Sequence, residues 1–191
     1  MTRGKLVAAA LAIACIPAFG DAITTDGSWH EFTFGVPGAV IGCGPANAQF
    51  CSATTNPVAE RNTVAPWTFT GPGSLFVMDI GDIGDRFQIF DNLVSLGNTS
   101  ATSGTTNLCG FDIACALAHL GGTGYSSGAF NILGAGSHSI TINLLINAPN
   151  TTGGNAVFSL SSVSGVPEPA TYLLVGTSLA TLVFLRRRQL I

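Results

Sequence analysis

The sequence predicts an all-β domain, an antiparallel β-sandwich or jelly roll, lying between two terminal segments of different character. Short stretches of alternating apolar and polar residues recur through the central part, and a period of two is typical of a half-buried strand. Gly, Pro, Asn or Ser bounds each stretch, and the 24 glycines suit the turns between strands. About 145 central residues are enough for one hydrophobic core.

The clearest stretch is SHSITINLLIN, residues 137–147, which places Ile140, Ile142, Leu144 and Ile146 on one face. Residues 74–80 form a continuous apolar run, as in a central strand. The other expected strands are HEFTFGV at 30–36 (Phe32, Phe34 and Val36 on one face), PWTFT at 66–70, DRFQIFD at 85–91 (Phe87, Ile89) and AVFSLSSV at 156–163 (Phe158, Leu160). We also expect a hairpin with its turn at Gly134–Ser137 and a short helix over Asp112–Leu120.

Residues 1–22 predict a secretory signal peptide, which implies the Sec translocon and signal peptidase as partners. Arg3 and Lys5 precede an apolar run, Pro17 breaks that run, and small residues follow. A cut is expected after Gly20 or after Ala22. A lipoprotein signal ending at Cys15 and a buried N-terminal helix are the weaker alternatives, since the residues before Cys15 lack the lipobox leucine.

Export leaves four cysteines: Cys43, Cys51, Cys109 and Cys115. An even number of cysteines in an oxidising compartment indicates disulfides. Three pairings are open, and we favour Cys43–Cys51 with Cys109–Cys115 because each closes a short local loop. A zinc site is the alternative, but the sequence has no C-x-x-C spacing.

Residues 21–165 contain two arginines, no lysine and nine acidic residues, which gives a formal net charge of −7. Such a domain repels phosphate backbones, so nucleic acid is not an expected partner.

Residues 166–191 form a C-terminal segment in three parts. Pro167, Glu168 and Pro169 come first, an uncharged apolar stretch follows over about 170–185, and Arg186, Arg187 and Arg188 end it. The apolar stretch is shorter than the ~20 residues that span a bilayer comfortably, although arginine side chains can reach outward to extend it. We expect one transmembrane helix in the inner membrane, with the arginines cytoplasmic and the exported domain, residues 23–165, outside.

This order of Pro-Glu-Pro, apolar helix and arginine cluster at the C-terminus resembles the PEP-CTERM sorting signal, with Ala170 and Thr171 extending the match. The resemblance implies a Gram-negative bacterium and processing by exosortase, a membrane protease or transpeptidase that cuts near the Pro-Glu-Pro. It also implies a destination at the cell surface or in the exopolysaccharide matrix. The central stretches GDRFQIFDN and GSHSITI, within about 24–163, resemble an uncharacterised β-sandwich domain of such proteins and, in general form, CUB-like jelly rolls.

Three groups of residues in the domain are considered as candidate binding sites. Asp79, Asp82 and Asp85 lie in a Gly-rich segment, where carboxylates can bind calcium, although a solvated acidic turn is the favoured explanation. Trp29, Trp67, Phe87 and Tyr125 form either a sugar-stacking surface or part of the core. The three histidines, His30, His119 and His138, are too far apart in sequence to indicate a metal or catalytic site.

The sequence shows no nucleophile elbow, carboxylate pair or phosphate-binding loop. We therefore expect a non-catalytic surface or matrix protein without a cofactor other than calcium. A carbohydrate-binding module, with or without calcium, and an envelope hydrolase are the alternatives.

Overall fold

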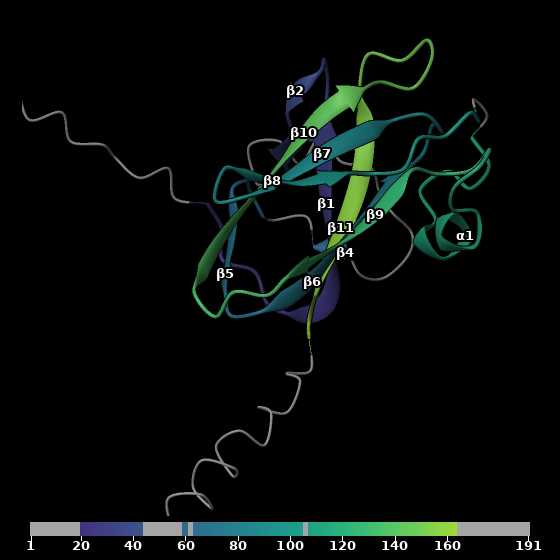
Figure 1. Ribbon diagram of the computed structural model, residues 1–191. Coiled ribbons are helices and arrows are strands. Elements are labelled where there is room, and N and C mark those ends of the chain that lie inside the picture. Colours follow the sequence, from purple (N-terminus) through teal and green to yellow (C-terminus); the bar gives the residue numbers. More distant parts are fainter. Residues whose placement is uncertain (1–19, 44–58, 61–62, 105–106, 164–191) are drawn as a thin grey trace, which may run out of the picture.

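The alternating stretches of the sequence form strands of two antiparallel sheets in the computed structural model (Figure 1), which describes residues 20–43, 59–60, 63–104 and 107–163. The first sheet has the order β3-β1-β11-β6-β9, with β4 pairing β1 in parallel, and the second has the order β2-β10-β7-β8, with β5 pairing β10. The first sheet contains β1 (Asp26–Phe34), β3 (Ile41–Gly42), β4 (Ala59–Glu60), β6 (Gly73–Ile80), β9 (Ser127–Ile132) and β11 (Gly154–Ser162). The second contains β2 (Gly38–Ala39), β5 (Trp67–Thr70), β7 (Arg86–Asp91), β8 (Val94–Asn98) and β10 (Ser137–Ile146).

One hydrophobic core lies between the two sheets and joins their inner faces. Phe32 on β1 meets Phe87 on β7 edge to face, with ring centroids 5.4 Å apart. Trp67 on β5 meets Phe158 on β11 at 4.6 Å. Interdigitated aromatic rings from opposite sheets are the packing of a β-sandwich, so the predicted fold class is confirmed.

A second apolar cluster lies on the outer face of the first sheet. Met78 and Ile80 of β6 and Val157 of β11 pack there under Ile113 and Ala116 of α1 (Ile113–Ala118), which lies to one side of the sheets in Figure 1. Because β6 has β11 and β9 as neighbours and contributes to both clusters, it is buried on both faces. This explains the unbroken apolar run over 74–80 and confirms the predicted central strand.

The hairpin predicted around Gly134–Ser137 is wrong. β9 pairs with β6 in the first sheet, whereas β10 pairs with β5 and β7 in the second. The loop between β9 and β10 therefore crosses from one sheet to the other. Both strands still direct apolar residues inward, Phe130 and Ile132 from one side and Ile140 and Ile142 from the other. The alternation was visible in the sequence, but the partner of each strand was not.

Two apolar side chains leave the faces predicted for them. Val36 is 78% exposed because β1 ends at Phe34. Ile146 is 51% exposed because the pairing of β10 with β7 shifts register between Leu144 and Ile146, and an irregularity of this kind turns the following side chain to the other face.

The first residues that the structure describes already belong to the sandwich. The Asp21 N–H donates to the Val64 carbonyl, the Thr68 N–H donates to the Asp21 carbonyl, and the Val64 N–H donates to Asp21 Oδ2 at 2.7 Å. Of the two expected cuts, only the one after Gly20 leaves Asp21 in the mature chain to make these bonds.

Within the described ranges, no helix is long and apolar enough to cross a membrane. Residues 1–19 of the predicted signal peptide (1–22) and the predicted transmembrane helix at 170–185 lie outside those ranges.

Candidate functional site

A disulfide joins Cys109 to Cys115 at the start of α1, with their Cα atoms 5.6 Å apart, and this predicted pair is confirmed. Both cysteines are partly exposed. Cys43 is also disulfide-bonded and is fully buried. Its expected partner, Cys51, lies outside the described residues, so the Cys43–Cys51 pairing stays a prediction.

The local sequence explains why the helix forms directly beside this disulfide. Asp112 is the N-cap, and its Oδ1 accepts a hydrogen bond from the Cys115 N–H at 3.0 Å. Ile113 and Ala116, three residues apart, form the buried side of the helix. His119 is the C-cap and lies four residues after Cys115, so both side chains project from the same side of α1.

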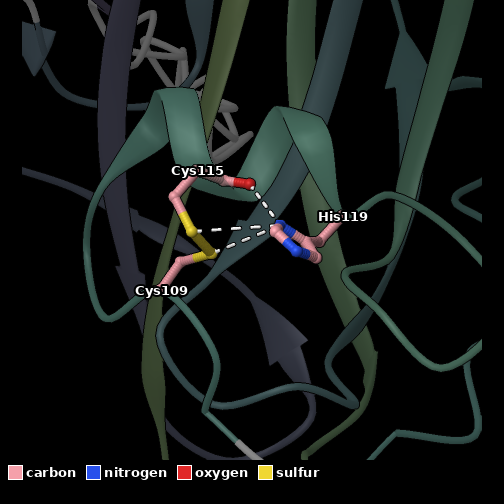
Figure 2. A group of neighbouring side chains, drawn as sticks. All are labelled: Cys109, Cys115 and His119. Atoms are coloured by element: carbon pink, nitrogen blue, oxygen red, sulfur yellow. Dashed lines mark hydrogen bonds between the residues drawn. A yellow bond between two sulfur atoms is a disulfide. The ribbon is translucent and has the colours of Figure 1, made fainter.

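This spacing places the His119 imidazole against the disulfide, as Figure 2 shows. The ring Nδ1 lies 3.8 Å from Cys109 Sγ, 3.9 Å from Cys115 Sγ and 2.9 Å from the Cys115 carbonyl oxygen. One ligand atom from each of the three residues lies within 4.8 Å of the others. The sequence analysis missed this group because it compared histidines only with each other, whereas the signal is the Cys-x-x-x-His spacing on the predicted helix.

Tyr125 holds the segment before the helix in place. Its hydroxyl oxygen accepts from the Cys109 N–H at 2.9 Å, and the hydroxyl donates to the Gly81 carbonyl at 3.2 Å. Burial of the ring raises the pKa of Tyr125, so the phenol stays protonated and keeps its donor.

Asp79 and Asp85 form a buried pair of carboxyl groups where the chain crosses from β6 to β7. Asp79 Oδ2 accepts from the Gly84 N–H at 3.4 Å, and Asp85 Oδ1 accepts from the Ala148 N–H at 2.7 Å. Burial, and then the charge of Asp85, raise the pKa of Asp79 well above its usual value. Burial also raises the pKa of Asp85 to about 6. Both carboxyl groups therefore hold their protons to a higher pH than an exposed aspartate does.

Asp82, the third residue of the predicted calcium set, is exposed on the turn between these two. Its charge contributes to the raised pKa of Asp85, but the three carboxylates do not gather into one cluster as Cys109, Cys115 and His119 do. Asp79 and Asp85 are not the solvated acidic turn that the sequence also allowed, since both are buried. Calcium binding at Asp79, Asp82 and Asp85 stays a prediction.

The aromatic residues considered for sugar stacking belong to the interior. Trp67, Phe87 and Tyr125 are fully buried. Trp29 is partly buried and packs edge to face against Phe76 at 6.1 Å. The sugar-stacking surface proposed for these four residues is therefore wrong, and the interior role is confirmed for three of them.

His138 has a structural environment on β10. Its Nδ1 lies 2.7 Å from Asp91 Oδ2 and its Nε2 lies 3.1 Å from the Gly134 carbonyl oxygen. Burial lowers the pKa of His138, but the hydrogen bond and charge of Asp91 oppose this effect and the net pKa is raised. With an acceptor at each ring nitrogen, His138 is best satisfied as an imidazolium that joins β10 to the end of β7.

Directly after the sandwich, residues 165–188 match the PEP-CTERM protein-sorting motif. The chain carries a PEP-CTERM sorting motif. Pro167, Glu168, Pro169 and Arg186–Arg188 all fall inside the match, which lies outside the described residues. The PEP-CTERM motif implies export, transient anchoring in a membrane and exosortase as the processing partner. No curated protein matches the chain.

Proposed function

We propose that this protein is a non-catalytic component of the cell surface or exopolysaccharide matrix of a Gram-negative bacterium. Its C-terminal helix holds it in the inner membrane with the arginines on the cytoplasmic side. Exosortase then cuts near Pro167–Pro169 and releases the β-sandwich. The PEP-CTERM motif at residues 165–188 is the observation that carries the proposal.

The position of the motif relative to the fold supports this sequence of events. β11 ends at Ser162, whose N–H donates to the Thr25 carbonyl, and the motif begins at residue 165. The sandwich is therefore complete before the sorting segment starts. Removing that segment breaks none of the strands that the described residues form.

The polar groups that the described residues bring together are engaged in structural contacts. His138 and Asp91 bond to each other and to the backbone, while Asp79 and Asp85 are buried against each other at the crossover between sheets. The partly exposed Cys109–Cys115 disulfide lies beside His119. These contacts support a structural role.

The sorting step is tested by changing the motif and following the protein in fractionated cells of its host. We expect Glu168→Ala and Pro167→Ala to keep the full chain in the membrane fraction, whereas the unchanged protein appears, shortened, outside the cell. Ser164→Ala, just before the matched segment, is the control and should be sorted normally.

Normal release of both motif variants would contradict exosortase processing. A separate assay addresses the matrix role: exopolysaccharide isolated from the host should retain the released domain through washing. A released domain that is recovered entirely free in the medium would contradict retention in the matrix while leaving the sorting step intact.

A further inference from the structure

The group of Cys109, Cys115 and His119 has the composition of a metal site whose thiol ligands are locked together. Thiolate and imidazole are the ligands that borderline divalent cations such as Zn²⁺ prefer over the oxygen-seeking Ca²⁺ and Mg²⁺. In the disulfide the two sulfur atoms are bonded to each other and carry no thiolate charge. The site is therefore closed to metal in the oxidised protein.

Reduction supplies both ligands in a balanced step. A dithiol reductant transfers two electrons to the Cys109–Cys115 bond and becomes a disulfide itself, and its two protons are taken up by the new thiols. A divalent cation that binds these thiols displaces both protons to solvent and leaves two thiolates on the metal.

The distances from His119 Nδ1 to the two sulfur atoms are close to those of a tetrahedral zinc site, and the sulfur atoms have to move apart to complete it. Bond lengths of about 2.3 Å for Zn–S and about 2.0–2.1 Å for Zn–N give tetrahedral edges near 3.6 Å between nitrogen and sulfur. The present distances from His119 Nδ1 to the two sulfur atoms are 3.8 and 3.9 Å. The sulfur atoms, once released from each other, need to move apart to about 3.8 Å.

The imidazole has to turn before it can present Nδ1 to a metal. Nδ1 now lies against the Cys115 carbonyl oxygen and has to give up that hydrogen bond. His119 is exposed, so the ring proton can move to Nε2 on the solvent side. Cys109 and Cys115 are also partly exposed, which leaves the fourth position of a tetrahedral ion open to water.

The backbone around the three residues is held by bonds that do not involve sulfur. The Cys109 N–H donates to Tyr125 Oη, the Cys115 N–H donates to Asp112 Oδ1, and the Tyr125 N–H donates to the His119 carbonyl at 2.9 Å. Breaking the disulfide removes none of these bonds. The ligand residues should therefore stay near their present positions in the reduced protein.

We propose that Cys109, Cys115 and His119 form a redox-gated zinc site, closed by the disulfide and opened by its reduction. The reduced form occurs before oxidation, when an exported chain first reaches an oxidising compartment. Zinc bound at that stage keeps the two thiolates together until a disulfide oxidant of that compartment reacts with them. The two thiolates then form the Cys109–Cys115 bond, the oxidant takes their two electrons and two protons from solvent to become two thiols, and Zn²⁺ is released. The proposal depends on the geometry beside α1 and is independent of the sorting step.

The test uses mature protein purified from the host and a phosphine reductant in small excess. The half-exposed Cys109–Cys115 bond should open before the buried Cys43 bond, which mass spectrometry verifies as a gain of two hydrogens and, after thiol alkylation and digestion, as label on Cys109 and Cys115. Co²⁺ then serves as a spectroscopic substitute for Zn²⁺. We expect thiolate-to-metal charge-transfer absorption at one equivalent in the reduced protein and none in the oxidised protein, with Zn²⁺ displacing the Co²⁺.

Variants assign the site. Cys109→Ser/Cys115→Ser should abolish the charge-transfer band, and His119→Ala should weaken Zn²⁺ binding by at least ~10-fold in competition with a chelating dye. The double variant still contains Cys43. A thiolate-to-metal charge-transfer band that persists in this variant would therefore come from other thiols, and it overturns the proposal. Unchanged zinc affinity in His119→Ala, or no binding by the reduced protein while its circular dichroism is native, overturns it as well.

Discussion

At the scale of single residues, the buried carboxyl groups of Asp79 and Asp85 make the stability of the fold depend on pH. Burial disfavours the ionised form and raises the pKa of both groups, and the charge of Asp85 raises the pKa of Asp79 further. A carboxyl group whose pKa is higher in the folded than in the unfolded chain binds extra protons in the folded state. Its contribution to stability is therefore present at low pH and is lost as the pH rises through the folded-state value.

We expect the free energy of unfolding to fall as the pH rises from about 4 to beyond 6, the window between the usual pKa of Asp85 and its raised value. Asp79→Asn removes one carboxyl group and lets an amide donate to Asp85 at every pH. The unfolding free energy of the variant should therefore depend less on pH. The difference in unfolding free energy between the variant and the unchanged protein should change by ~1–3 kcal/mol between pH 5 and pH 7.5. Urea unfolding at both pH values measures the shift.

Asp82→Asn is the matched control, because Asp82 is exposed on the same turn, and it should alter the pH dependence little. Equal slopes for the unchanged protein and Asp79→Asn would contradict the raised pKa of Asp79. The same samples test the calcium prediction. A cation held by Asp79 and Asp85 would raise the unfolding midpoint when Ca²⁺ is added at pH 7.5, and chelation or Asp79→Asn would remove that increase.

At the scale of elements, α1 has too few residues to be stable alone and depends on its attachments. Its buried side packs over β6 and β11, and Tyr125 bonds to the loop that leads into it. Tyr125→Phe keeps the ring but leaves the Cys109 N–H and the Gly81 carbonyl without their partner. We expect a loss of ~1–3 kcal/mol in unfolding free energy and faster reduction of the Cys109–Cys115 bond.

Denaturant unfolding and timed mass spectrometry measure these two effects. Leu117→Ala on the exposed side of α1 is the control and should change stability by no more than ~0.5 kcal/mol. A Tyr125→Phe protein with unchanged stability and unchanged reduction rate would show that the packing of the ring alone holds the segment.

The strands were predictable from the sequence because burial on one face imposes alternation, as Ile140, Ile142 and Leu144 show on β10. The N-cap at Asp112 and the short disulfide loop were also local signals. The pairing of strands depends on residues far apart in the chain. The local sequence therefore predicted a hairpin of β9 and β10, although the two strands lie in different sheets. The proximity of Asp79 to Asp85 and the burial of Trp67 and Phe87 likewise depend on the crossover between sheets.

At the scale of the whole molecule, the sandwich and the sorting segment are consecutive and separate. The described domain runs from residue 20 to β11 and has its own core, and the PEP-CTERM motif begins within three residues of the last strand. The formal charge of −7 over residues 21–165 suits a soluble extracellular domain once its tail is removed. We therefore propose that the C-terminal segment is a sorting signal that is removed and that the β-sandwich is the mature protein.

Intact mass of the protein recovered from its host, measured with and without reduction, tests that claim most directly. The account predicts a chain that begins at Asp21 or Ile23, ends near Val166–Pro169, and gains four hydrogens when two disulfides are fully reduced. A mass that retains Tyr172–Ile191 would make the tail a permanent anchor and would contradict processing at the motif.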